Sequence, residues 1–338
     1  MRTPHARRIG PLVLLGAAVL IGVLGKGVAL PRIELERAKN PGLGVRALHA
    51  QGVTGAGVAV AIIDGQMRLD HEEYAHAVVY YEELDDFAGR PFEAHGPAMA
   101  SLLVGSTVGV APAAELHYDA LDFARLTPER LAAAIDRVVE RNRELAANDR
   151  VRLLSISTGF GGERQVVAAA IARALDADVF VLITNFPVDW VDPPLAIRSL
   201  GCSPWRDCDD PASFDLSPGE VTYWRSEGLT AAVALAARSA RDADQGLSTL
   251  YVPANRRTLA GPRHARHYEL DVEGGYSEWA PYLSGLLALA LQVAPELRAS
   301  DLAALLADGV TELEHGVRLV DPARVVALAR ERAARARR

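Results

Sequence analysis

Residues 58–63, Val58-Ala59-Val60-Ala61-Ile62-Ile63, form a continuous apolar run that is followed at once by Asp64. An unbroken run of small and β-branched apolar residues is typical of a parallel strand that is buried on both faces. In open parallel sheets, ligands and reacting groups gather at the carboxyl ends of the strands. The run therefore predicts a central strand, and Asp64 is a candidate functional residue.

Strand-like and helix-like patterns alternate after this run. Apolar stretches suited to buried strands recur at 151–156 and 179–183. Apolar residues with helical spacing precede each of these stretches, over 127–139 and 164–175. Repeated strand–helix–strand units are typical of a parallel sheet covered by helices. The chain is therefore predicted to have an α/β fold with three layers, in which a mostly parallel central sheet has helices on both faces.

Composition indicates a globular protein and restricts its partners. Half of the 338 residues are apolar and 23% are charged, which excludes a disordered chain. The net charge of −7 argues against nucleic acid as the main partner. Gly52, Gly55 and Gly57 precede the first strand, whereas a dinucleotide-binding loop follows its strand, so that class is rejected. No feature requires a cofactor or assigns a metal, and the sequence gives no position for structural calcium.

The N-terminus has the pattern of an export signal. Arg2, Arg7 and Arg8 precede an apolar run from Ile9 to Gly25. Residues 1–30 are therefore predicted to be an uncleaved signal anchor or a cleaved signal peptide, with a buried core helix as a third alternative. Basic residues on the N-terminal side place the rest of the chain outside the cytoplasm. We expect an extracytoplasmic protein, either secreted or held in the cell membrane by a single span with its N-terminus inside.

Two cysteines, Cys202 and Cys208, stand close together in a segment that also contains Pro204. In an exported protein such a pair favours a disulfide over a metal site. No histidine lies close enough in sequence to complete a zinc site. We therefore expect a disulfide that closes a small loop and stabilises the fold modestly.

The stretch Gly274-Gly275-Tyr276-Ser277-Glu278-Trp279-Ala280-Pro281 leads into an apolar repeat at 286–291. Gly275 permits a sharp turn, which places Ser277 at the start of a buried helix. Unpaired backbone N–H groups and the positive end of the helix dipole favour negative charge there. Ser277 is therefore either a helix cap, a common role for serine, or a nucleophile whose product is an oxyanion.

Three other polar residues stand at the ends of predicted elements. Asp64 ends the first strand, His95 precedes a helix of small and apolar residues, and Asn185 follows the strand at 179–183. A nucleophilic serine needs a base, an acid that orients the base, and donors for the oxyanion. Each residue also has an ordinary alternative, because Asp and Asn are common in turns and histidine is often partly buried in a core.

With their flanking sequences, these residues resemble the subtilisin-like serine proteases, the subtilases. Five blocks follow the family's order from about residue 44 to about residue 325. The first block, Leu48 to Asp64 with His71, is similar to the family's mature N-terminal block, and the second, His95-Gly96-Pro97-Ala98-Met99-Ala100 with the Gly109-Val110-Ala111-Pro112 turn, is similar to HGTHVAG and the turn after it. The third, Ser157-Thr158-Gly159, is similar to the substrate-binding SLG strand, and the fourth, Asn185, to the oxyanion asparagine. The fifth, Gly275-Tyr276-Ser277 with Pro281 and Gly285, is similar to GTSMAxPxxxG.

The resemblance implies a three-layer subtilisin-like fold and a serine endopeptidase that acts on polypeptides. Ser277 would attack the peptide carbonyl, His95 would transfer the proton, and Asp64 would orient His95. Asn185 and the Ser277 N–H would hold the oxyanion, and 157–159 would pair with the substrate backbone. A catalytically silent protein of this fold, acting as a binding or scaffolding module, is the alternative.

The peptidase domain implied by the resemblance covers residues 45–325. The segment before it, 31–44, is polar with Pro and Gly, and is expected to be a linker or extended arm. The segment after it, 326–338, is expected to be a basic C-terminal tail. Five of the last nine residues are arginines, which fits a solvated helix end or a contact with anionic lipid headgroups.

The sequence departs from the family pattern at several positions beside the site. Asp-Thr-Gly is replaced by Asp64-Gly65-Gln66, the Thr after His-Gly by Pro97, and Gly-Thr-Ser by Gly275-Tyr276-Ser277. The Ala-Gly that usually precedes the asparagine is Ile183-Thr184. We expect these larger side chains to crowd the pocket for the residue before the cut, so that small residues are preferred there or turnover is slow.

Overall fold

The computed structural model describes residues 32–159, 162–184, 188–203, 205–215, 239–254, 256–272 and 276–337. The elements below all belong to one compact unit, Pro31–Arg338. The predicted signal segment, 1–30, lies outside the described residues. Within the described ranges, no helix combines the length and the apolar character needed to cross a bilayer.

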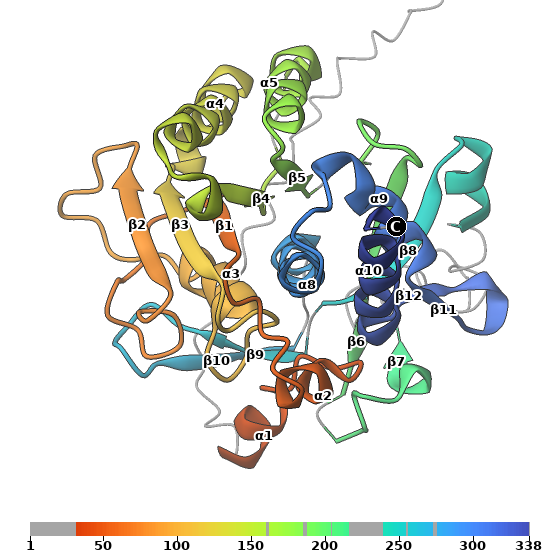
Figure 1. The fold of residues 1–338 in the computed structure, drawn as a ribbon. Coiled ribbons are helices and arrows are strands. Elements are labelled where there is room, and N and C mark those ends of the chain that lie inside the picture. The colour runs from red at the N-terminus through yellow and green to blue at the C-terminus, as the bar shows by residue number, and fades with distance from the viewer. Residues whose placement is uncertain are drawn as a thin grey trace, which may run out of the picture. The chain divides into compact units, whose positions relative to one another are not determined.

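A parallel sheet of five strands forms one half of this unit, in the order β2-β3-β1-β4-β5 (Figure 1). The strands are β1 (Ala59–Asp64), β2 (Val78–Glu83), β3 (Glu115–Ala120), β4 (Val151–Ile156) and β5 (Phe180–Ile183). The apolar runs that predicted strands at 58–63, 151–156 and 179–183 therefore form the centre and one edge of this sheet. The predicted α/β fold with a mostly parallel sheet is confirmed.

Helices cover both faces of this sheet. Helices α4 (Pro128–Glu144) and α5 (Arg164–Asp176) lie on one face, and α3 (His95–Val104) and α8 (Trp279–Val293) on the other. Successive strand residues point to opposite faces. Ala59, Ala61 and Ile63 accordingly pack with α4 and α5, whereas Val60 and Ile62 pack with α3 and α8. The same alternation places Asp64 on the α3 and α8 face.

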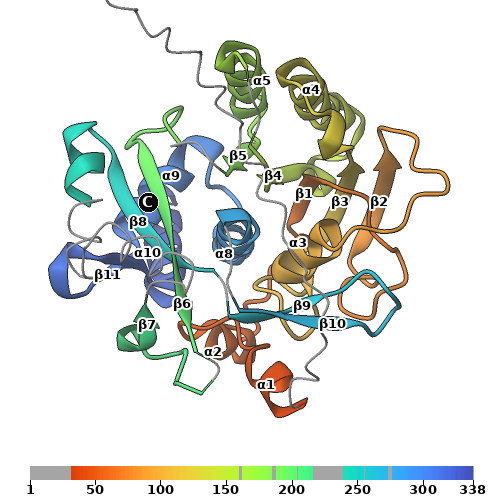
Figure 2. The same cartoon turned by 180° about the vertical axis from the view of Figure 1, so that it is seen from behind.

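A second sheet follows the order β11-β12-β8-β6-β7. Its inner strands β12, β8 and β6 are parallel, and the two outer strands pair antiparallel to them. Helix α8 runs between the two sheets (Figures 1 and 2) and is buried from Trp279 to Leu291, as its apolar sequence predicts. The strands of this sheet are β6 (Leu195–Cys202), β7 (Phe214–Asp215), β8 (Ser248–Pro253), β11 (Val310–Glu312) and β12 (Arg318–Val320). Other elements are α9 (Ala299–Asp308), α10 (Pro322–Ala336) and the short 3-10 helices η1 (Phe123–Arg125), η2 (Ala147–Asp149), η3 (Pro211–Ser213) and η5 (Glu314–Gly316).

The segment expected to be a linker has structure of its own. Helix α1 (Arg32–Arg37) is followed by a loop and by α2 (Val45–Ala50). The loop is tied to the hairpin of β9 (Arg257–Ala260) and β10 (Tyr268–Asp271), because Thr258 donates from its N–H to the Ala38 carbonyl, at 3.0 Å. The Thr258 hydroxyl also donates to the Leu35 carbonyl, at 2.6 Å. Residues 32–44 are therefore an integral part of the domain.

The predicted C-terminal tail is the end of a packed helix. Helix α10 continues to Ala336, and Val326, Ala329 and Ala333 are buried on one side of it. Its arginines lie on the other side, where Arg332 pairs with Asp308 at 3.0 Å. The expected domain boundary at residue 325 therefore falls inside a helix, because apolar residues with helical spacing continue among the arginines.

Candidate active site

Asp64 and His95 meet at the point where β1 ends and α3 begins. The Nδ1 atom of His95 lies 2.6 Å from Asp64 Oδ1, which also accepts the Gly65 N–H at 2.7 Å. The Asp64 side chain is fully buried, and 18% of the His95 side chain is exposed. A carboxylate at Nδ1 favours the tautomer with its proton there, which leaves Nε2 free to accept a proton. This pair has the geometry of an oriented general base.

The surroundings of His95 favour its charged form. Burial opposes protonation of the ring, but the charge and hydrogen bond of Asp64, with a contribution from Glu93, outweigh it and raise the pKa of His95 above 6.5. An imidazolium at this position is therefore stabilised.

Close packing at Gly96 brings α3 against the end of β1. A Cβ atom there would collide with the Tyr118 hydroxyl and the Gly65 carbonyl, which are themselves joined by a hydrogen bond of 2.5 Å. The second carboxylate oxygen of Asp64, Oδ2, is buried and has no hydrogen-bond partner within the described residues. Gly65 stands where the family has a threonine, so the chain has no hydroxyl at the residue after Asp64.

Ser277 lies in the 3-10 turn η4 (Tyr276–Glu278), directly before α8. Its hydroxyl donates to the Ser157 carbonyl at 3.4 Å, and the Ser157 hydroxyl donates to the Ser277 carbonyl at 2.8 Å. The N-cap of α8 is Glu278, so Ser277 does not cap this helix. Within the described residues, no hydrogen bond joins Ser277 to His95. Ser277 therefore lies at the end of β4, and its hydroxyl is hydrogen-bonded to Ser157 and not to the His95 ring.

Helix α8 is packed closely against the turn that follows α3. A Cβ atom at Gly285 would lie 2.6 Å from the Val110 Cβ, so only glycine allows this approach. Pro281 lies in the first turn of α8, where proline is tolerated. Two motifs that are far apart in the sequence, 109–112 and 277–285, are therefore in contact and hold α8 against the turn that follows α3.

The expected substrate-binding segment follows β4 directly. Ser157 is buried, whereas Thr158 and Gly159 are partly exposed. The expected oxyanion residue, Asn185, lies outside the described residues. Ile183 packs in the core formed with α4 and α5, so any crowding of the pocket must come from Thr184, which is fully buried.

Two functional candidates escaped the sequence analysis. Glu278 follows Ser277 and is only 1% exposed, and Arg257 of β9 is only 5% exposed. The guanidinium of Arg257 lies 5.4 Å from the centre of the Tyr282 ring in the first turn of α8. Glu278 could have been found from the sequence, because the family motif GTSMA has an apolar methionine at that position.

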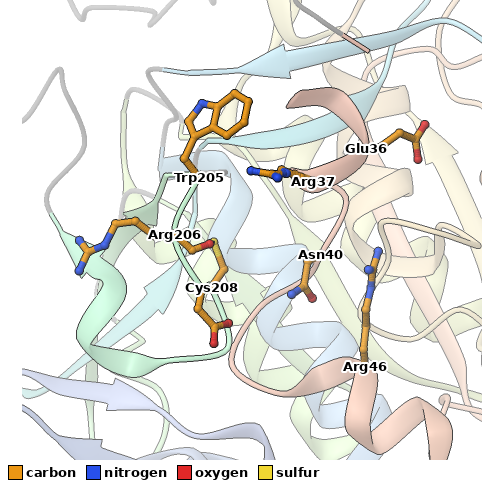
Figure 3. A pocket seen from close by; sticks show the side chains of 8 residues that line it. Glu36, Arg37, Asn40, Arg46, Trp205, Arg206 and Cys208 are labelled. Atoms are coloured by element: carbon orange, nitrogen blue, oxygen red, sulfur yellow. The ribbon is translucent and has the colours of Figure 1, made fainter. Parts of the chain in front are cut away.

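Cys202 and Cys208 form a disulfide with a Cα–Cα distance of 5.6 Å. A pocket of about 550 Å³ lies between this loop and α1, with Arg37 stacked 4.6 Å from the Trp205 ring (Figure 3). None of the residues predicted for catalysis lines this pocket. In the part of the chain that the structure describes, no cluster of His, Cys, Asp or Glu side chains is arranged to hold a metal ion.

The sequence was compared with those of known proteins. No protein-family model matches the chain. Subtilisin-like protease PopC of Myxococcus xanthus (strain DK1622) is 24% identical over 300 residues, which cover 80% of this chain and 59% of that protein. The chain therefore spans less than two thirds of this relative.

Solved structures with a similar fold include subtilisin-like proteins. The subtilase cytotoxin SubAB structure superposes with a TM-score of 0.62 at 14% identity, over 87% of this chain and 96% of that chain. A cold adapted subtilisin-like serine proteinase superposes with a TM-score of 0.52 at 17% identity, over 79% and 89% respectively. The fold is that of the subtilisin-like proteins. In sequence, the chain is similar to a subtilisin-like protease, so it is subtilase-like in both respects.

Proposed function

We propose that the protein is a serine endopeptidase whose nucleophile is Ser277, whose base is His95 and whose orienting acid is Asp64. The observation that carries the proposal is the 2.6 Å contact between His95 Nδ1 and Asp64 Oδ1. It lies at the carboxyl end of a parallel strand, beside the helix that begins just after Ser277. An imidazole held by a buried carboxylate in a subtilisin-like fold is suited to activating a hydroxyl.

The reaction proceeds by acyl transfer. His95 Nε2 takes the proton of the Ser277 hydroxyl as Oγ attacks the peptide carbonyl, and then gives that proton to the leaving amine. Asp64 stabilises the imidazolium that exists between these steps. Asn185 and the Ser277 N–H donate to the oxyanion, and water releases the acyl group in a second cycle.

The nucleophile has to turn before it can react. Its hydroxyl donates to the Ser157 carbonyl at 3.4 Å, which is a weak contact. The reaction requires that rotation about χ1 bring Oγ to His95 Nε2, while the Ser157 hydroxyl holds the Ser277 carbonyl. Substrate pairs with residues 157–159 as an added strand, beside the hydroxyl that must move.

Hydrolysis of an unfolded protein substrate tests this proposal. Purified wild type is expected to cleave denatured casein, and Ser277→Ala and His95→Ala are expected to abolish cleavage while melting at the wild-type temperature. Equal cleavage by wild type and both variants would show that the activity belongs to a contaminant and would reject these roles.

A catalytically silent binding module remains the second candidate. The observation that favours it is that Ser277 bonds to Ser157 instead of His95. Tyr276, which replaces a threonine beside the nucleophile, is 40% exposed. If this candidate holds, the wild-type protein will bind an unfolded polypeptide without cleaving it, and Ser277→Ala will bind equally well.

Export is a separate proposal, which rests on the N-terminal sequence. Arg2, Arg7 and Arg8 before an apolar run support transfer of the domain across a membrane, with residues 1–30 acting as an anchor or a cleaved signal. A fusion of residues 1–44 to alkaline phosphatase is expected to be active outside the cytoplasm. Replacing two of the apolar residues in the run by Asp should leave the fusion inside and inactive.

A further inference from the structure

A second pocket borders the Asp64–His95 pair. Its volume is about 320 Å³, and its lining comes from three segments, namely residues 66–70 after β1, the end of β2, and Phe92 before α3. Gln66 follows Asp64 by two residues, and Phe92 precedes His95 by three. The pocket is therefore built on the same two segments that carry the acid and the base.

Close packing keeps these two segments together beside the imidazole. A Cβ atom at Gly96 would lie 3.2 Å from the Gln66 carbonyl, so the loop after β1 abuts the first turn of α3. A Cβ atom at Gly65 would lie 3.3 Å from the Glu93 carboxylate, which brings the residues before His95 against the same loop. Two separate contacts therefore hold the walls of the pocket at the start of α3.

The strand order places the pocket and the expected substrate-binding segment on opposite sides of β1. The order is β2-β3-β1-β4-β5 and all five strands are parallel, so the ends of β2, β1 and β4 lie along one edge of the sheet (Figure 1). Neighbouring strands are about 4.8 Å apart, so the ends of β1 and β2 are about 10 Å apart, which an extended chain spans with about three residues. A polypeptide that pairs with residues 157–159 and passes over His95 therefore reaches the pocket within a few residues.

Two of the lining side chains are apolar and exposed. Leu69 is 48% exposed and Phe92 is 38% exposed, and Met67, which is 1% exposed, forms a buried part of the wall. Apolar side chains that gather around a concave surface are typical of a contact site for another apolar group. The volume lies at the lower end of the range for ligand pockets, which suits a single side chain.

The polar groups of the lining are bonded to one another. Arg68 donates to Asp70 from Nε at 2.9 Å and from Nη2 at 2.6 Å. Glu83 accepts from the Gln66 amide at 3.2 Å and from the Tyr81 hydroxyl at 3.1 Å. A polar ligand would have to displace these hydrogen bonds, whereas an apolar side chain displaces only water. The pocket therefore favours an apolar side chain over a charged one.

We propose that this pocket is an additional substrate subsite, which takes a large apolar side chain of the polypeptide at a position beyond the imidazole. Leu69 and Phe92 are its specificity-determining residues. The occupant is the substrate itself, because the pocket is continuous with the segments that carry Asp64 and His95 and lies within a few residues of the expected backbone pairing at 157–159. This inference rests on the proposed function, since it assigns a preference to the same site.

A set of quenched fluorogenic peptides tests the subsite in the full chain. The residue before the cut is the same in every peptide, and a single phenylalanine replaces alanine at each of the other positions in turn. In the wild type, we expect one position to raise kcat/KM about tenfold over the alanine peptide, because apolar surface is buried there. Leu69→Ala and Phe92→Ala are each expected to lower this ratio to about twofold or less, since each removes part of the apolar wall.

Val79→Ala is the matched control, because Val79 is 55% exposed in β2 and does not line the pocket. Its ratio should equal that of the wild type. Thermal unfolding, measured in parallel, checks that every variant is folded. A preference that survives in both Leu69→Ala and Phe92→Ala, or the lack of any preferred position in an active wild type, would overturn the proposal.

Binding measurements separate failure of the proposed function from failure of this inference. If the wild type cleaves none of the peptides, the proposed function is rejected, and the affinity for fluorescein-labelled versions is measured by anisotropy. Weaker binding of one phenylalanine peptide to Leu69→Ala and Phe92→Ala than to Val79→Ala would retain the apolar subsite in a binding module, whereas equal binding would reject it. If the wild type cleaves but its preference does not depend on Leu69 or Phe92, the proposed function stands and only this inference is rejected.

Discussion

The two halves of the candidate site differ in how completely they are formed. The acid–base half consists of Asp64 and His95, which are joined at 2.6 Å at the end of β1. The nucleophile half consists of Ser277 in a short turn, with a hydroxyl that bonds to the Ser157 carbonyl instead of the imidazole. The first half lies on a regular strand and a helix of ten residues, and the second lies on a 3-10 turn of three.

Under the proposed function, this difference predicts where control over reactivity lies. The orientation of His95 is fixed by buried hydrogen bonds, so its state depends on charge and pH. The orientation of Ser277 depends on what holds the turn before α8, where the Ser157 hydroxyl donates to the Ser277 carbonyl. Substitutions in the first half should therefore change the protonation chemistry, and substitutions in the second half should change the geometry.

The largest effect is expected from breaking the acid–base half. Asp64→Asn keeps the size of the side chain but removes the charge that orients and stabilises His95. We expect kcat to fall by about 10⁴-fold with little change in KM. Initial rates on a fluorogenic peptide measure this fall. A loss of tenfold or less would mean that His95 is oriented by something other than Asp64.

A smaller effect is expected in the pocket for the residue before the cut. Thr184 is fully buried beside the site, whereas Ile183 packs on the opposite face of β5. Thr184→Gly is expected to raise kcat/KM for a large aromatic residue at that position by about tenfold relative to alanine, on the scale of a small change in pocket volume. Ile183→Val is the matched control and should not change the preference. Fastest cleavage after aromatic residues in the wild type would contradict the expected crowding.

The pH dependence of activity tests the raised pKa of His95. Its pKa is raised above 6.5, and only the neutral ring accepts a proton. Activity should therefore rise about tenfold per pH unit at acidic pH and reach half its maximum above pH 6.5. The contribution of the Asp64–His95 pair to the free energy of unfolding changes with pH in the opposite direction. It is complete at low pH and is lost as the pH rises through the pKa of His95 in the folded protein.

Glu93→Gln is the control for this pH limb, because Glu93 contributes to the raised pKa without touching the imidazole hydrogen bond. The midpoint of the activity profile should move to lower pH in this variant. A midpoint that stays in place, or one that lies below pH 6.5 in the wild type, would contradict the electrostatic account.

The smallest effect is expected from loosening the nucleophile half at Ser157. Ser157→Ala removes the hydrogen bond from its hydroxyl to the Ser277 carbonyl and leaves the backbone for substrate pairing intact. Losing one neutral hydrogen bond corresponds to about 1 kcal/mol, or about fivefold in kcat. Ser155→Ala, at a buried position in β4, is the control. A variant with wild-type kcat would show that this bond does not hold the nucleophile.

The fold and the acid–base half were predictable because their signals are local. The continuous run at 58–63 indicates a buried strand, and the alternation of its residues places Asp64 on a definite face. The small residues after His95 indicate a tightly packed helix, and Gly96 shows why packing at its start is so close. The resemblance to subtilases then placed these elements in a single fold.

The nucleophile half was less predictable because its contacts join residues far apart in the chain. Nothing near Arg257 in the sequence indicates that it lies beside Tyr282 at the start of α8, and nothing near Thr258 indicates that it holds the arm at Ala38. The direction of the Ser277 hydroxyl is a rotamer choice, which no sequence pattern records. By contrast, the spacing of Val326, Ala329 and Ala333 is helical and could have revealed α10 inside the expected tail.

The central claim is that Ser277 is a nucleophile activated by His95, and covalent labelling tests it most directly. Wild-type protein, Ser277→Ala and His95→Ala are treated with a fluorophosphonate probe, and the labelled peptide is identified by mass spectrometry. We expect one adduct per chain on Ser277 in the wild type, none in Ser277→Ala, and labelling slowed by orders of magnitude in His95→Ala. A folded wild type that takes up no probe, or one labelled at another residue, would contradict the account.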